Sequence, residues 1–147
     1  MDAAAQEVLL FEVGGQRYGL PALQVQEIVR AVTMVPLHQG TAALAGVINL
    51  RGDIVPVIDL RPWFGLSGRA VEPADHLIIV VCGEQRAALH VDRVTELVPA
   101  QPAAVQDAML ETKLNGQAWI AKIQDEVVLV YEPQVFLMPA AAARGTP

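Results

Sequence analysis

The chain has 147 residues and a mass of 15.8 kDa, which corresponds to about one domain, or to two very small units that share a core. Apolar residues make up 53% and charged residues 18%, a composition that excludes disorder over most of the chain. The net charge is −6, and an acidic chain without a basic stripe is a poor candidate for binding nucleic acid or anionic membrane.

The apolar residues recur with the short period of β-strands rather than the longer period of helices. The opening segment predicts a hairpin, in which Val8–Val13 and Gln16–Leu20 pair across a Gly14-Gly15 turn. Pairing should stop at Pro21, because proline has no N–H to donate. Further strands are expected at Ile54–Leu60, Leu77–Cys82, Gln85–Val91 and Glu126–Tyr131.

Helix is expected in two short segments. Leu23–Val29 could form about two turns, and Ala103–Lys113 about two or three. Ten prolines and eleven glycines, distributed along the chain, fit short strands joined by tight loops. The predicted fold class is therefore mainly β, with short helices.

An internal repeat is the most informative structural feature of the sequence. Residues 9–29 align without gaps on residues 78–98, with seven identities in twenty-one positions, where about one or two would arise by chance. A second match relates Ile54–Asp59 to Glu126–Tyr131. The alternative is that any two hairpins of a β protein look alike.

Two copies of one β unit are the simplest interpretation, over about 8–70 and 76–137, with a connection near Ser67–Ala74. Units of this size bury little surface alone, so we expect two small barrels packed together, with or without a strand exchanged between them. The ends of the chain, residues 1–7 and 140–147, are expected to be flexible tails.

Groups for catalysis or metal binding are sparse. The histidines His38, His76 and His90 lie far apart, without metal-ligand spacing. The single cysteine, Cys82, cannot form an internal disulfide, which favours a reducing compartment and excludes a multi-cysteine zinc site. No nucleophile, zinc-protease or phosphate-loop motif is present, so we expect no enzyme, no metal and no cofactor.

Localisation is indicated by two further features. No positive charge precedes the first apolar run, so no signal peptide is expected. The longest apolar runs, such as Leu77–Cys82, are far shorter than the roughly 20 residues that span a bilayer. We therefore expect a soluble, cytoplasmic protein without direct membrane insertion.

The central stretch Gly46–Arg61 contains two apolar strands around a short polar turn, Arg51-Gly52-Asp53. Gly52 permits a positive φ, so Arg51 and Asp53 can project from the turn. On composition alone, this stretch could equally be an ordinary hairpin with solvated charges.

Taken with other segments, this stretch resembles the CheW family, the adaptor proteins of bacterial chemosensory arrays. The resemblance covers residues 8–137 as a single CheW-like domain. Its matching segments, in order along the chain, are Phe11–Leu20, Val25–Ile28, Val35-Pro36, Gly46–Leu60, Phe64-Gly65, Leu89–Val94 and Val127–Tyr131.

This resemblance implies two five-stranded SH3-like β-barrels packed side by side and a protein that is not an enzyme. Such adaptors join the cytoplasmic tip of a methyl-accepting chemoreceptor to the regulatory domain of a CheA-type histidine kinase, and are recruited to receptor arrays at the membrane. Carried over residue by residue, the resemblance implies a receptor-binding site made of Val25, Glu27, Gly46, Asn49 and Arg51.

Departures from the family pattern begin after Val98. Pro99–Val105 is rich in alanine, and Trp119–Ile123 lacks the glycine that usually precedes the last strands. The kinase-binding residues are therefore left unassigned. Three functions stay open: an adaptor of a chemotaxis array, an adaptor of a non-flagellar pathway (twitching or development) or another β-barrel interaction module, and, least favoured, an enzyme with a hidden site.

Overall fold

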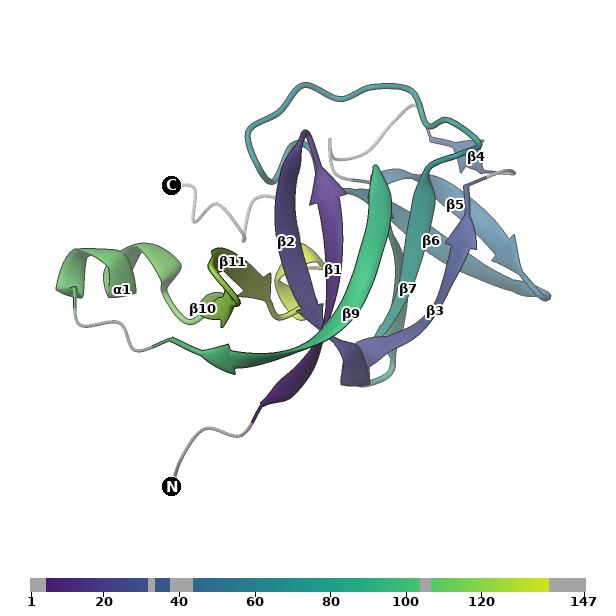
Figure 1. Ribbon diagram of the computed structural model, residues 1–147. Helices are drawn as coiled ribbons and strands as arrows, with labels where there is room; N and C mark the ends of the chain where they lie inside the picture. The colour runs from purple at the N-terminus through teal and green to yellow at the C-terminus, as the bar shows by residue number, and fades with distance from the viewer. Residues whose placement is uncertain (1–4, 32–33, 38–43, 104–106, 138–147) are drawn as a thin grey trace.

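The computed structural model describes residues 5–31, 34–37, 44–103 and 107–137. Within these ranges strands are the main element, as Figure 1 shows. The elements are β1 (Gln6–Val13), β2 (Gln16–Pro21), a 3₁₀ turn (Ala22–Gln24), β3 (Val25–Arg30), β4 (Val35–Pro36), β5 (Leu44–Leu50), β6 (Asp53–Asp59), β7 (His76–Cys82), β8 (Gln85–Val91), β9 (Arg93–Pro102), α1 (Ala108–Leu114), β10 (Ala118–Ile123), β11 (Glu126–Tyr131) and α2 (Gln134–Leu137).

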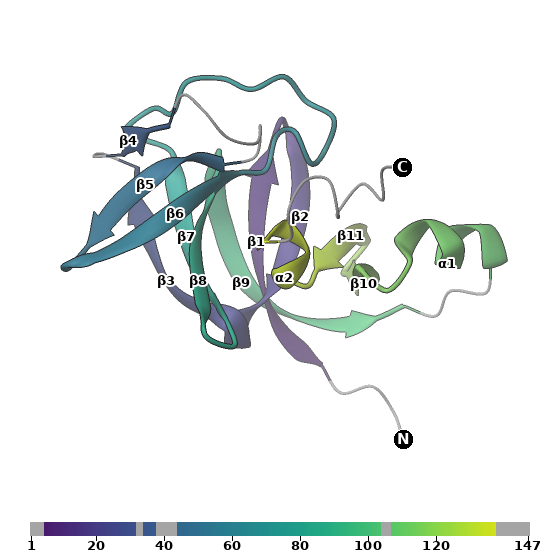
Figure 2. The same cartoon turned by 180° about the vertical axis from the view of Figure 1, so that it is seen from behind.

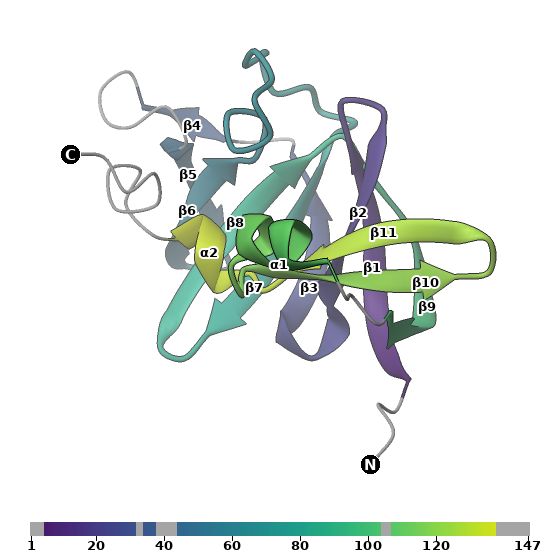
Figure 3. The same ribbon diagram turned by 90° about the vertical axis from the view of Figure 1, so that its left-hand side faces the viewer.

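The strands form two sheets (Figures 1 and 2). The first is a closed barrel in the order β1-β2-β11-β10-β9, and the second is a six-stranded sheet in the order β3-β7-β8-β6-β5-β4. Figure 3 shows the β10–β11 hairpin steeply inclined to β1 and β2. The mainly β fold of two SH3-like units is confirmed. The second unit differs from the expected five strands, because the two-residue strand β4 is added at its edge.

Strands from both halves of the chain contribute to each sheet. The opening hairpin β1–β2 pairs with β9 and β11, whereas β3 leaves it to pair with β7 in the six-stranded sheet. Each sheet contains one parallel contact, β11 with β2 in the barrel and β6 with β8 in the six-stranded sheet. Each sheet therefore combines strands from both halves of the chain in the same way. The unit boundaries 8–70 and 76–137 and the exchange of a strand between the units stay a prediction.

The predicted helix at Leu23–Val29 is wrong. Only a 3₁₀ turn over Ala22–Gln24 forms, and Val25–Arg30 is strand β3. Partly buried and exposed residues alternate along β3, and its β-branched side chains suit a pleated strand with one covered face. Seven residues allow either period, and pairing with β7 selects the strand.

The second predicted helix forms, but over a shorter range than Ala103–Lys113. Helix α1 begins at Ala108, where the Asp107 side chain accepts a hydrogen bond from the Leu110 N–H at 3.1 Å. It ends at Leu114, and the next residue, Asn115, adopts the left-handed conformation typical of a helix C-terminus. Residues 104–106 lie outside the described part of the chain.

The ends of β1 and β2 can be compared with those that the sequence predicts. Strand β2 ends at Pro21, which confirms where pairing was expected to stop. Strand β1 begins at Gln6, so Gln6 and Glu7, which we assigned to the N-terminal tail, pair with Ala100 and Pro99. Residues 1–4 and 140–147 lie outside the described ranges.

Three apolar clusters form among the described residues. One lies inside the barrel around Val8, Leu10 and Val130, and a second lies inside the six-stranded sheet around Val57, Leu77 and Ile79. The third, called here the shared cluster, draws on both sheets and on α2. Its buried members are Leu9, Phe11, Val13, Leu20, Leu60, Ile78, Val80, Ala87, Leu89, Val91, Val135 and Phe136.

Candidate functional site

The tip of the β5–β6 hairpin carries the most prominent of the predicted site residues. Arg51 and Gly52 have φ angles of 50° and 95°, the two positive values that a tight hairpin turn requires. The Asn49 side-chain oxygen accepts a hydrogen bond from the Gly52 N–H at 2.7 Å and closes the turn. The Arg51 side chain, 66% exposed, is thus presented at a fixed point of the surface.

Arg51 forms an ion pair with Glu27 on β3. Both guanidinium Nη atoms donate to the Glu27 carboxylate, whose side chain is 27% exposed. The hydrogen bond from Arg51 lowers the pKa of Glu27, and the same contact raises the pKa of Arg51, so both groups are charged at neutral pH. Because β3 and β5 are not neighbours in the six-stranded sheet, the pair links its first strand to a hairpin near its other edge.

A second ion pair lies beside the first. Arg86 on β8 donates to Asp53 at 2.7 Å, and its charge also acts on the pKa of Glu27. Asp53 and Arg86 line a hollow of about 620 Å³ with the exposed apolar side chains of Ile54 and Val81. Charged pairs around exposed apolar groups are typical of a protein-binding surface.

Val25 lies in a different environment from Arg51. It pairs with Val80 of β7, and its partly buried side chain packs against the shared cluster. Leu23, fully exposed, and Ile28, 42% exposed, are the apolar side chains that this part of the chain offers to solvent. Neither residue is predictable as part of the site from the sequence, because a pattern of apolar residues does not show which of them the neighbouring sheet leaves uncovered.

Gly46 has a packing role within the sheet. It lies opposite Pro36 of β4, and a Cβ atom at this position would lie 2.3 Å from the Val35 carbonyl oxygen and 3.0 Å from the Pro36 Cα. Only glycine allows β4 to approach β5 so closely. Of the five predicted residues, the structure therefore joins Glu27 to Arg51 and Asn49 to the same turn, whereas Gly46 and Val25 each have packing contacts of their own.

We expect Gly46→Ala to lower the free energy of unfolding by about 1–3 kcal/mol, the range for a residue forced into a packed site. The clash should displace β4 and speed exchange of the Leu37 N–H, which donates to the Ala45 carbonyl at 3.0 Å. Thermal melting and amide exchange measure these effects. The matched control is Gly68→Ala, whose Cβ would meet its nearest atom, an Asp59 carboxylate oxygen, at an ordinary 3.8 Å. Equal melting of the two variants would contradict the close β4–β5 contact.

The other candidate groups are dispersed. His76 accepts a hydrogen bond from the Val94 N–H at 2.9 Å, His90 is buried, and His38 lies outside the described residues. Burial raises the pKa of the Cys82 thiol. Among the residues with described positions, no cluster of three or more His, Cys, Asp or Glu side chains could hold a metal ion. No helix in the same ranges is long and apolar enough to cross a membrane.

Comparisons with known proteins agree on one family. The model of the CheW-like domain matches residues 7–138. Chemotaxis protein CheW of Klebsiella aerogenes is 31% identical over 73% of this chain, and that of Helicobacter pylori is 32% identical over 86%. Protein FrzA of Myxococcus xanthus is 33% identical over 63%. The matches span 64%, 78% and 58% of the lengths of these three relatives.

A solved structure gives the same result. The crystal structure of the scaffolding protein TtCheW from Thermoanaerobacter tengcongensis superposes with a TM-score of 0.70 at 29% sequence identity, over 87% of this chain and 89% of that one. Since the family model matches nearly the whole chain, and relatives above 30% identity align over more than two thirds of it, the chain belongs to the CheW-like domain family.

Proposed function

We propose that this chain is a non-catalytic chemotaxis scaffold that couples the cytoplasmic tip of a methyl-accepting chemoreceptor to the regulatory domain of a CheA-type histidine kinase. The observation that carries the proposal is the family match over residues 7–138. Its support is that several relatives are named chemotaxis protein CheW, and that the superposed structure is named a scaffolding protein. The proposal includes a cytoplasmic location, recruitment to receptor arrays, and no cofactor.

The receptor-binding surface in this proposal includes Val25, Glu27, Gly46, Asn49 and Arg51. The geometry favours Arg51 as its centre, because this side chain is exposed, charged and held by a bidentate partner in a defined direction. The exposed apolar side chains of Ile28 and Ile54 could contact an apolar face of a helical hairpin. Gly46 would then act indirectly, by holding β4 against β5.

A three-component binding experiment tests the function. A soluble receptor-tip fragment is immobilised, and the kinase regulatory domain is added with and without this chain. We expect the chain to bind each partner alone and to increase retention of the kinase domain on the receptor beads. Binding to neither partner, or competition between them, would refute the scaffold role.

One alternative is an adaptor of a non-flagellar chemosensory pathway or a more general β-barrel interaction module. The similarity to Protein FrzA of Myxococcus xanthus favours keeping the non-flagellar case in view. The same experiment separates the cases when receptor and kinase fragments from both kinds of pathway are compared. Preference for the non-flagellar pair would select the alternative.

A further inference from the structure

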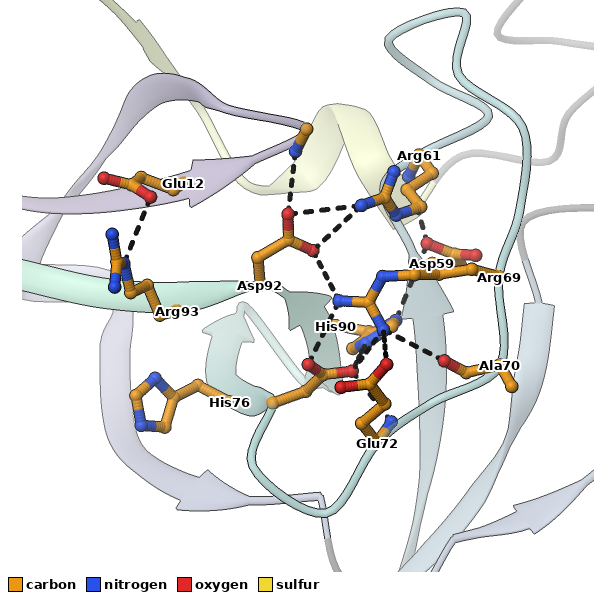
Figure 4. A network of polar contacts seen from close by, with 12 residues as sticks. Glu12, Asp59, Arg61, Arg69, Ala70, Glu72, His76, His90, Asp92 and Arg93 are labelled. Atoms are coloured by element: carbon orange, nitrogen blue, oxygen red, sulfur yellow. Dashed lines mark hydrogen bonds and ion pairs between the residues drawn. The ribbon is translucent and has the colours of Figure 1, made fainter.

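A buried polar cluster lies where the six-stranded sheet meets the connection between β6 and β7 (Figure 4). Its centre is His90 on β8, which is 1% exposed. The His90 Nε2 atom is 2.7 Å from an Asp75 carboxylate oxygen, and its Nδ1 atom faces an Asp59 carboxylate oxygen at 3.6 Å. Asp75 is 4% exposed and Asp59 is 8% exposed, so water cannot solvate these charges freely.

Each nitrogen of His90 faces a carboxylate oxygen, and when both carboxylates are ionised each nitrogen needs a proton. A neutral imidazole has one N–H donor and one lone-pair acceptor. If Nε2 donates to Asp75, the lone pair of Nδ1 faces the Asp59 carboxylate, and Nδ1 is a buried atom without a hydrogen-bond partner at the observed distance. A second proton on Nδ1 converts this contact between two acceptors into an attraction between opposite charges.

With the carboxylates of Asp59, Asp75 and Asp92 ionised, the charges around His90 balance when the imidazole is protonated. Arg69 donates to Asp75 at 2.9 Å and to Asp92 at 2.8 Å, and Arg61 donates to Asp92 at 3.2 Å. Three buried or half-buried carboxylates thus face two guanidinium groups, and the imidazolium supplies the third positive charge. The charged or titratable groups around His90 are Asp59 on β6, Arg61, Arg69 and Glu72 on the connection, Asp75 and His76 at the start of β7, and Asp92 after β8.

The cluster connects segments that are far apart in the chain through hydrogen bonds. The Asp75 carbonyl accepts the Ala31 N–H at 3.0 Å, next to the end of β3. Asp92 accepts the Gly14 N–H at 2.8 Å, in the β1–β2 turn of the barrel. The connection carrying Arg61 and Arg69 runs across the end of both sheets in Figure 1.

Solvent reaches the edge of this cluster. A hollow of about 440 Å³ is lined by Asp59 and Arg69 together with apolar side chains such as Met34 and Val71. The hollow therefore gives solvent a path to the edge of the cluster.

We propose that His90 is a proton-controlled latch: the imidazolium bridges Asp59 and Asp75 and holds the β6–β7 connection on both sheets, and loss of its proton as the pH rises loosens that connection. Burial alone lowers the pKa of His90, but the carboxylates of Asp59 and Asp75 outweigh burial and raise it above 6.5. Burial opposes ionisation of Asp75 too, but hydrogen bonds from Arg69, the Glu72 N–H and His90 lower its pKa to about 2, so it stays charged.

The sign of the pH dependence follows from linkage. Because the pKa of His90 is higher in the folded than in the unfolded state, protonation of His90 adds to the free energy of unfolding. This contribution is complete below the unfolded pKa of 6.5 and is lost as the pH rises through the folded pKa. Between those two values the unfolding equilibrium constant should increase by up to about tenfold per pH unit. His90→Gln, which cannot titrate, should lack this increase.

The experiment follows the His90 ring nitrogens of the full chain by NMR from pH 5 to 9, with resonances assigned from His90→Gln and His76→Gln. We expect both His90 nitrogens to carry protons at pH 6.5, and deprotonation to coincide with faster exchange of the Ala31 N–H and of amides in residues 61–75, after correction for intrinsic rates. Asp59→Asn should shift the His90 titration to lower pH. His76→Gln is the control and should leave the His90 titration unchanged.

Two results would overturn the proposal. One is a neutral His90 at pH 6.5 with the proton on Asp59, seen in the carboxyl ¹³C shift. The other is the same pH dependence of stability, by chemical denaturation, in wild type and His90→Gln. Because denaturation needs no partner, these readouts are independent of the scaffold function.

Discussion

Arg51→Glu is expected to weaken receptor binding strongly while the fold persists. The side chain is 66% exposed, so its loss removes no core contact. Its reversal places a second carboxylate beside Glu27 and removes the cation offered at the hairpin tip. Truncation of one partner of a desolvated charged pair typically costs about 2–5 kcal/mol, so affinity should fall by roughly 30-fold or more.

A matched control exists in the same molecule. Arg93 is 65% exposed and pairs with Glu12, which is 26% exposed, against 66% and 27% for Arg51 and Glu27. Arg93→Glu therefore breaks a second ion pair of equal exposure on another surface, and should leave receptor binding unchanged. Both variants should melt close to wild type, since exposed pairs contribute about 0–1 kcal/mol.

The double variant Glu27→Arg, Arg51→Glu separates two roles for the pair. If Arg51 contacts the receptor directly, restoring the ion pair with reversed charges should not restore binding. If the pair serves only to hold the hairpin, binding should return. Wild-type binding by the folded single variant Arg51→Glu would show that the site assignment is wrong.

Val25→Asp is unsuitable as a second variant for testing the apolar part of the receptor-binding surface. In the structure Val25 packs against the shared cluster, so a charge there disturbs the core as well as the surface. Leu23→Asp is the better choice, because Leu23 is fully exposed and its replacement leaves the core unchanged.

Phe11→Ala is expected to lower the free energy of unfolding by about 3–5 kcal/mol, the usual cost of deleting a buried aromatic ring. Phe11 is fully buried in the shared cluster, and its ring lies 6.0 Å from that of Tyr18 between centroids. Because the shared cluster draws on both sheets, the loss should weaken both together. The barrel and the six-stranded sheet should unfold in a single transition.

The two tryptophans provide separate reporters. Trp63 contacts Phe136 at the shared cluster, with ring centroids 5.3 Å apart, and Trp119 packs against the cluster inside the barrel. Single-tryptophan variants, Trp63→Phe and Trp119→Phe, allow urea unfolding to be followed at each position with and without Phe11→Ala. Leu97→Ala, at a position that is 54% exposed, is the control and should change stability little. Two separate transitions would show that the sheets do not depend on the shared cluster.

The local pattern of apolar residues predicted the strands of the hairpins but not strand β3. Hairpins such as β1–β2 carry their own turn signal in Gly14-Gly15, so their strands follow from neighbouring residues. Strand β3 has no such turn, and its partner is β7, about fifty residues later. Pairing across that distance is a tertiary contact, which is why periodicity over seven residues gave a helix.

By itself, the sequence determined the mainly β class, the repeat, the hairpin turn at Arg51 and the absence of catalytic motifs, because each depends on residues close together in the chain or on composition. Only the tertiary structure decided that Glu27 forms an ion pair with Arg51, that Gly46 allows the close approach of β4, and that His90 lies between Asp59 and Asp75. These contacts join residues brought together by strand pairing across the sheet, and their energies depend on burial, which no single stretch of sequence specifies.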